Sequence, residues 1–226
     1  MVRMLLCLLA ILCTMGRVES GAANKDMNTD VFVFQRDDHG MQSHVTVQPL
    51  KEEPLRSFRL CFRTYTDTSR PYSLFHLRSV SSPFAEITVY KESSKSYTLT
   101  VGREDVIFYT QEAINKWEHL CFSWESATGT ARLWVDEKPM PRKGLSKGYV
   151  IPSKANLMLG KRRSMSPFVT QFTGEMYDVS MWDYVLSWED IQKFQFGPQS
   201  VPPGNILNWR NLTYEEIGHV VVQPYQ

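Results

Sequence analysis

Short runs of alternating apolar and polar residues make up most of the chain. In the run at 44–50, Val45 and Val47 alternate with Thr46 and Gln48. Alternation with a period of two, in runs rich in β-branched and aromatic residues, predicts strands that bury one face. Gly, Pro, Ser and Asp occupy the breaks between the runs and favour turns. The predicted strands are 31–34, 44–50, 58–62, 72–75, 86–90, 97–101, 106–109, 119–124, 131–135, 156–159 and a segment within 172–182.

One segment near the C-terminus has helical spacing instead. Trp188, Ile191 and Phe194 recur every three residues, Ser187 is a suitable N-cap, and a Gly-Pro pair follows at 197–198. We predict one short helix whose three apolar residues pack on a sheet. Many short strands and a single helix predict an all-β, two-layer sandwich rather than parallel α/β units.

The N-terminus has the pattern of a secretory signal peptide. Arg3 precedes an unbroken apolar run at 4–13, and small residues follow at 20–23. The apolar run is shorter than the roughly 20 residues that span a bilayer. We predict a signal peptide at 1–20, with cleavage between 20 and 23, and a single domain at 21–226 that is secreted, extracellular and without a transmembrane segment. A buried N-terminal helix is the alternative.

Four cysteines divide between the predicted leader and the mature chain. Cys7 and Cys13 lie in the leader, which leaves Cys61 and Cys121. Two cysteines in an oxidising compartment favour one disulfide, and two buried thiols are the alternative. In the chain-entropy model such a bridge contributes roughly 4 kcal/mol.

Charge and motifs favour neither nucleic-acid binding nor catalysis. The net charge is +1, so nothing indicates a nucleic acid partner. The five histidines have no metal-ligand spacing and no nucleophile motif beside them. Adjacent acids such as Glu52 and Glu53 are typical of turns. We predict a protein that is not an enzyme; a glycosidase, which would need two acids facing one groove, is the alternative.

The segment 119–126, His-Leu-Cys-Phe-Ser-Trp-Glu-Ser, resembles the pentraxin signature His-x-Cys-x-Ser/Thr-Trp-x-Ser/Thr at every fixed position. Residues 127–136, 143–149, 181–187 and 205–210 are also similar to pentraxin segments, and Cys61 stands where the family keeps its disulfide partner. The resemblance covers nearly the whole mature chain. The chain is identified as a member of the pentraxin family, in its short branch or its mucosal branch.

The resemblance implies a two-sheet antiparallel jelly-roll sandwich of the kind shared with legume lectins. It also implies a homo-oligomer, a pentameric ring whose subunits bind phosphocholine, anionic saccharides or phospholipids on one face through two Ca²⁺ ions each. The other face would engage complement or Fc receptor proteins. The implied role is pattern recognition in innate immunity and the acute phase.

The chain departs from the family where calcium ligands are expected. The resemblance places Phe84 and Ala85 where an Asp-Asn pair should stand, and the basic run 161–163 where acids should stand. Calcium takes six to eight oxygen ligands, and cations repel it. We therefore expect weak or no calcium binding. Glu86 and Glu175 are nearby acids, and Glu86 is interpreted as a solvated residue at the end of a strand.

The residues that the family uses to contact the organic group of the ligand are better preserved than its calcium ligands. The resemblance places Tyr90 at an aromatic position, Asp105 at an acidic position and Thr100 on the pocket wall between them. An aromatic face with a nearby carboxylate suits a quaternary ammonium group. Arg162 and Arg163 are candidates for binding a phosphate directly, because arginine forks match its geometry. The alternative for Tyr90 is an ordinary strand residue, and for Asp105 an ordinary turn residue. The alternative for the basic run 161–163 is a solvated run of surface charges.

A sequon at Asn211 predicts N-glycosylation.

Taken together, the sequence predicts a secreted, non-enzymatic, lectin-like recognition protein of innate immunity with degenerate calcium ligands. The alternative is a repurposed pentraxin that acts as a calcium-independent protein–protein interaction module with no small-ligand site.

Overall fold

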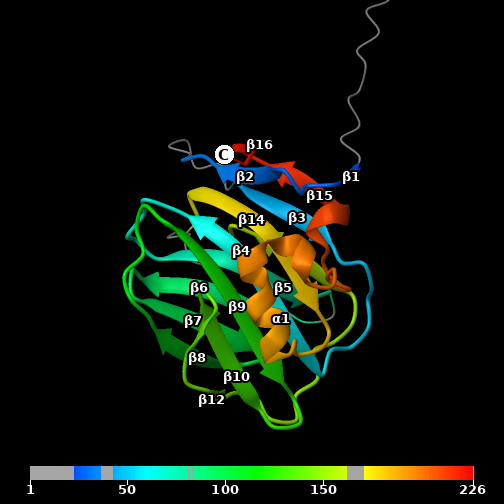
Figure 1. The fold of residues 1–226 in the computed structure, drawn as a ribbon. Coiled ribbons are helices and arrows are strands. Elements are labelled where there is room, and N and C mark those ends of the chain that lie inside the picture. The colour runs from blue at the N-terminus through cyan, green and yellow to red at the C-terminus, as the bar shows by residue number, and fades with distance from the viewer. Residues whose placement is uncertain (1–22, 37–42, 81, 83, 162–170, 226) are drawn as a thin grey trace, which may run out of the picture.

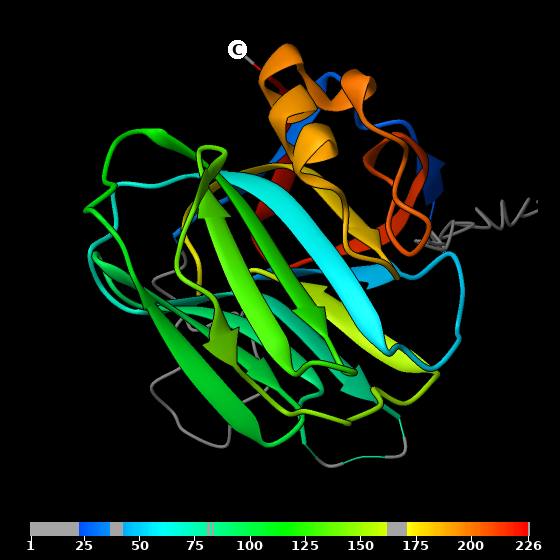
Figure 2. The same ribbon diagram turned by 60° about the horizontal axis from the view of Figure 1, so that its bottom comes forward.

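The described residues form two eight-stranded antiparallel sheets packed face to face (Figure 1). The computed structural model describes residues 23–36, 43–80, 82, 84–161 and 171–225. Figure 2 shows the sheets as two layers, with the helical turns of residues 188–200 gathered beside one of them. The expected signal peptide lies outside the described residues and stays a prediction.

The first sheet has the most N-terminal described strand at one of its edges. Its order is β1 (Ala23–Lys25), β15 (Leu212–Ile217), β3 (His44–Gln48), β13 (Ala155–Leu159), β5 (Tyr72–Ser79), β6 (Ile87–Ser93), β7 (Ser96–Val101) and β8 (Glu104–Tyr109).

The second sheet carries the signature segment at its centre. Its order is β11 (Lys138–Pro139), β10 (Thr130–Val135), β9 (Trp117–Glu125), β4 (Ser57–Tyr65), β14 (Gly174–Trp182), β2 (Asp30–Phe34) and β16 (Val220–Pro224), with β12 (Lys143–Gly144) also paired to β10.

The main hydrophobic core lies between the two sheets. Phe122 of β9 points inward and meets Tyr97 and Phe108 of the first sheet, at ring-centroid separations of 6.1 Å and 6.5 Å. Alternate residues of a strand point to opposite faces, so each strand gives one row to this core. The all-β two-sheet prediction is confirmed.

A buried ion pair joins the sheets inside this core. Lys91 Nζ lies 3.1 Å from Glu118 Oε2, and the Tyr97 hydroxyl donates to the same oxygen at 2.6 Å. Lys91 also donates to the Tyr97 oxygen at 2.8 Å. Desolvation lowers the pKa of Lys91, and Glu118 opposes that shift. The three groups satisfy one another where an unpaired charge would be costly.

A second hydrophobic cluster lies outside the second sheet, under α1 (Trp188–Lys193). Ser187 caps α1 as predicted and accepts from the Asp190 amide at 3.1 Å. Ile191 and Phe194 are buried against the sheet, but Trp188 is 48% exposed, so its predicted packing is wrong. Side chains in a helix point toward its N-terminus, over the preceding turn. Because Trp188 is the first residue of α1, its side chain has no preceding helical turn to cover.

After α1 the chain continues as short 3₁₀ turns. These are η1 (Phe194–Phe196) and η2 (Pro198–Ser200), separated by Gly197 at φ +95°, and η3 (Trp209–Asn211) follows. The sequence analysis missed β15 and β16, although Val220–Pro224 is rich in valine. Of the helices among the described residues, none combines the length and apolar character needed to cross a membrane.

Candidate ligand-binding site

Tyr90, Thr100 and Asp105 share the outer surface of the first sheet. Thr100 of β7 lies directly opposite Asp105 of β8, and Tyr90 of β6 lies opposite Thr98 of β7. Because residues two apart on a strand share a face, all four side chains emerge on the side away from the core. Tyr90 and Thr100 are half-buried, and Asp105 is exposed. We call these four residues the recognition face.

The same outer surface continues across the neighbouring strands. Thr88 lies between Thr100 and His76, which in turn pairs with Met158 of β13. Farther along, a hollow of about 370 Å³ opens over β5, β13, β3 and β15, with Arg78 in its lining. Since α1 packs on the other sheet (Figure 1), it does not cover this surface, on which Tyr90 and Thr100 are half-buried and Thr88 and His76 are buried.

The first of the two expected calcium loops carries an aromatic ring in place of acids. Phe84 is 52% exposed, and the Arg103 guanidinium carbon lies 4.7 Å from its ring centroid. Ala85 follows, and neither side chain carries an oxygen. The loop therefore presents a cation stacked on an aromatic ring.

Glu86 has a structural partner, and its interpretation as a solvated residue is wrong. It is 2% exposed, and its Oε2 accepts from the Tyr149 hydroxyl at 2.5 Å. Desolvation and Glu86 together raise the pKa of Tyr149 to about 12, so the phenol keeps its proton. Glu175 lies on β14 of the second sheet, whereas Glu86 directly precedes β6 of the first.

The second expected calcium loop begins at Lys161, which follows β13 and Gly160. Arg162 and Arg163 lie outside the described residues, and their predicted phosphate contact stays a prediction. Within the described part of both loops, Glu86 is the one carboxylate, and Tyr149 already binds it. A calcium ion takes six to eight oxygens, so the described residues do not fit the family's calcium site.

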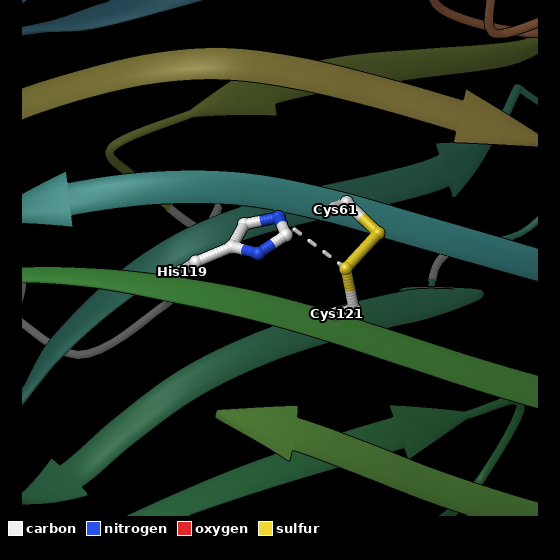
Figure 3. Close-up of side chains that lie close together, drawn as sticks. All are labelled: Cys61, His119 and Cys121. Atoms are coloured by element: carbon white, nitrogen blue, oxygen red, sulfur yellow. Dashed lines mark hydrogen bonds between the residues drawn. A yellow bond between two sulfur atoms is a disulfide. The ribbon is translucent and has the colours of Figure 1, made fainter. Parts of the chain in front are cut away.

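One cluster of potential metal-ligating atoms lies under α1. The ligand atoms of Cys61, His119 and Cys121 are within 4.8 Å of one another (Figure 3). The two sulfurs form a disulfide, as predicted, and a disulfide offers no thiolate to a metal. His119 Nε2 lies 3.5 Å from Cys121 Sγ, and its Nδ1 lies 2.7 Å from Glu137 Oε1. His119 therefore packs between the disulfide and Glu137.

A buried carboxylate that the sequence analysis missed lies on β14. Asp178 has φ +55° where the β4–β14 register shifts, and burial raises its pKa to about 7. Its Oδ2 and Trp209 Nε1 have no hydrogen-bond partner among the described residues. Both residues line a cavity of about 10 Å³. The sequence signal was an acid between the apolar residues Tyr177 and Val179.

The family model that matches this chain is that of the Pentaxin family, over residues 30–224; the name is also spelled pentraxin. The chain belongs to the pentraxin family. It is similar to serum amyloid P-component of Rattus norvegicus, with 40% identity covering 89% of this chain and 88% of that relative. C-reactive protein of Sus scrofa is 36% identical, and the match covers 99% of this chain and 98% of that relative. Mucosal pentraxin of Rattus norvegicus is 33% identical, covering 92% of both chains.

Among solved structures, this pentraxin is similar to the native heptameric SAP-like pentraxin from Limulus polyphemus. The TM-score is 0.74 at 16% identity, covering 88% of this chain and 96% of that one. At that identity the likeness shows the shared fold. The family resemblance inferred from residues 119–126 is confirmed.

The pentraxin signature itself proves to be structural. Trp124 Nε1 donates to the Leu145 carbonyl at 2.8 Å, and the Ser126 hydroxyl donates to the Tyr149 carbonyl at 2.5 Å. His119 and Cys121 build the disulfide environment described above. The signature therefore identifies the scaffold, and the predicted ligand residues Tyr90, Thr100 and Asp105 lie on other strands.

Proposed function

We propose that this pentraxin is a secreted, non-enzymatic recognition protein of innate immunity. It binds ligands on its recognition face with little or no contribution from calcium. The recognition and immune roles follow from the pentraxin family and from relatives such as serum amyloid P-component and C-reactive protein. The observation that carries the proposal is the placement of Tyr90, Thr100 and Asp105 on one open surface.

The chemistry of that surface favours a quaternary ammonium group such as that of phosphocholine. A cation is attracted to the face of an aromatic ring, here Tyr90, and an exposed carboxylate, here Asp105, adds a full charge. Thr100 lies opposite Asp105 and fills the wall between the two groups. The phosphate end would need its own cation, and Arg162 and Arg163 remain the candidates from the sequence.

Calorimetric titration with phosphocholine in a calcium chelator tests the proposal. We expect saturable heat for the wild type and at least about tenfold weaker binding for Tyr90→Ala and for Asp105→Asn. Tyr184→Ala is the matched control, because this 40% exposed tyrosine precedes α1 on the second sheet's side and should leave binding unchanged. No heat for the wild type in chelator or in calcium would contradict the proposal.

Assembly and modification complete the proposed picture. We propose a ring of identical subunits: the family resemblance implies five, and the Limulus relative is heptameric. Asn211 is exposed at the end of η3, which supports glycan attachment there. Sedimentation of the secreted protein measures the ring size, and a mass shift on enzymatic N-glycan removal, lost in Asn211→Gln, tests the modification.

One observation favours the alternative of a protein–protein interaction module. Tyr184, Val185, Trp188 and Phe196 are exposed apolar residues on the segment that surrounds α1, and Phe196 is 75% exposed. Exposed apolar residues gathered on one segment are typical of contact surfaces. If the alternative holds, Trp188→Ala and Phe196→Ala abolish binding to a protein partner, while phosphocholine gives no heat with any variant.

A further inference from the structure

Three loops at one end of the first sheet line an open hollow of about 620 Å³, which we call the loop cavity. They are the β5–β6 loop with Phe84, the β7–β8 turn with Arg103, and the segment 146–149 that ends at Tyr149. This volume is within the range of small-molecule sites in proteins. None of the recognition-face residues lines it.

Tyr149 forms a fixed wall of the loop cavity. A Cβ atom at Gly102, which has φ +64°, would lie 3.0–3.2 Å from three atoms of the Tyr149 ring. The glycine therefore lets the ring lie against the backbone of the β7–β8 turn. The hydroxyl is held by the buried carboxylate of Glu86 at 2.5 Å. The hydroxyl end of the ring is thus positioned before any ligand arrives.

The rim of the loop cavity carries two cations without acidic partners. Arg103 is stacked on Phe84 at 4.7 Å, and Lys147 is exposed on the opposite loop. Neither forms an ion pair within the part of the chain that the structure describes. Stacking on a ring holds a guanidinium plane in place while its N–H groups remain available at the edge. The rim is therefore prepared to donate hydrogen bonds to an anion.

The two acids of the loop cavity are already engaged as acceptors. Glu86 receives the Tyr149 hydroxyl, and Glu104 Oε2 receives the Ser146 amide at 2.8 Å and the Ser146 hydroxyl at 3.3 Å. Bonded in this way, they position the loops. The groups left for a ligand are two cations and two aromatic rings.

We propose that the loop cavity binds an aryl oxyanion, a phosphate, sulfate or carboxylate attached to an aromatic ring, without a metal ion. The oxyanion accepts from Arg103 and Lys147, and the ligand's ring packs against Phe84 and Tyr149. Charge-assisted bonds to an arginine fork fix the anion, and ring contacts supply the remaining affinity. The inference goes beyond the proposed function, since it uses a separate set of residues.

Calorimetric titration of the full mature protein with phenyl phosphate, in a calcium chelator, tests this site. We expect saturable binding that is at least about tenfold weaker in Arg103→Glu and in Lys147→Glu. Inorganic phosphate, which has no ring, should bind at least about fivefold more weakly than phenyl phosphate, and Phe84→Ala should remove that difference. Phenyl sulfate and benzoate in place of phenyl phosphate determine which oxyanion the site prefers.

Two controls keep the outcome interpretable. Lys138→Glu reverses an exposed cation on β11 of the second sheet and should leave phenyl phosphate binding unchanged. Tyr90→Ala should retain phenyl phosphate binding while it loses phosphocholine, which separates this site from the recognition face. Absence of phenyl phosphate binding in the wild type, or equal affinity in wild type and Arg103→Glu, would overturn the proposal. Equal affinities for phosphate and phenyl phosphate would overturn the role of the rings.

Discussion

The two outer surfaces of the sandwich differ in what covers them. The outer surface of the second sheet is covered by Ile191 of α1 and Phe194 of η1, which pack in one cluster with the Cys61–Cys121 disulfide. The outer surface of the first sheet carries threonines, Tyr90 and Asp105, and α1 does not reach it. The first of these surfaces is part of a hydrophobic cluster, and the second is the one on which we propose ligand recognition.

Side-chain chemistry explains the difference. The outward row of the second sheet includes Cys61, Cys121 and Trp182, each 1% exposed or less, and such apolar area is stabilised by removal from water. The threonine hydroxyls on the outer surface of the first sheet can form hydrogen bonds with water. Substitutions under α1 should therefore change the free energy of unfolding, whereas substitutions on the recognition face should change binding. The following predictions test this division.

Removing the disulfide should have the largest effect. The bridge closes a loop with a sequence separation of 60, and Cys61→Ala/Cys121→Ala should lower the free energy of unfolding by roughly 4 kcal/mol. Urea unfolding followed by tryptophan fluorescence measures this change. A loss below about 1 kcal/mol would show that α1 alone holds this surface together.

Shortening a residue of α1 should come next. Ile191→Ala leaves a cavity in the cluster under the helix and should cost about 2–4 kcal/mol. Trp188→Ala is the matched control on the same helix: its ring is 48% exposed, so we expect a loss of under about 1 kcal/mol. Similar losses for both variants in urea unfolding would contradict the packing described here.

Asp178 should make this side of the molecule sensitive to pH. Burial raises its folded-state pKa from 3.8 to about 7, although Arg63 and Arg210 oppose the shift. Because the folded state holds the Asp178 proton more tightly than the unfolded state does, this proton contributes fully to the free energy of unfolding below pH 4. That contribution is lost as the pH rises through 7. Asp178→Asn should therefore be more stable than wild type at pH 8, by at most about 4 kcal/mol, with the difference disappearing near pH 4.

Urea midpoints between pH 4 and 8 measure the Asp178 effect. Asparagine tolerates the positive φ of this position, so the variant should fold. A constant difference between variant and wild type across that range would mean that Asp178 does not titrate there.

The smallest change in stability should follow substitution on the open surface. Tyr90→Ala should lower the free energy of unfolding by under about 1 kcal/mol, since its half-buried ring lies on the solvent side of β6. The same variant is expected to lose phosphocholine. A loss of several kcal/mol would place Tyr90 among the residues that stabilise the sandwich.

The sequence predicted those features of the fold that depend on local pattern. Alternation located β3, β13, β5, β6 and β7 of the first sheet and β4, β9 and β14 of the second, and Ser187 located the start of α1. Glu86 was misjudged because its partner, Tyr149, is 63 residues away. Asp178 was missed because its burial follows from a register shift between β4 and β14. The predicted packing of Trp188 was wrong because helical spacing alone does not show which residues of a helix lie over the sheet.

The candidate site was predictable only through the family. No local pattern relates Tyr90 to Asp105; the pairing of β6, β7 and β8 brings them onto one surface. The loop cavity was not predictable from either source, since it depends on Arg103, Phe84 and Tyr149 meeting from three separate loops. Contacts between distant segments are set by the tertiary structure.

The central claim is that this pentraxin recognises its ligands without the calcium chemistry of its family. Calorimetric titration of the purified mature protein with calcium, alone and with phosphocholine, tests that claim most directly. The account predicts no saturable heat from calcium in the millimolar range expected of extracellular calcium modules, together with intact folding and assembly. Heat that saturates at about two ions per subunit, with phosphocholine binding that requires them, would contradict it.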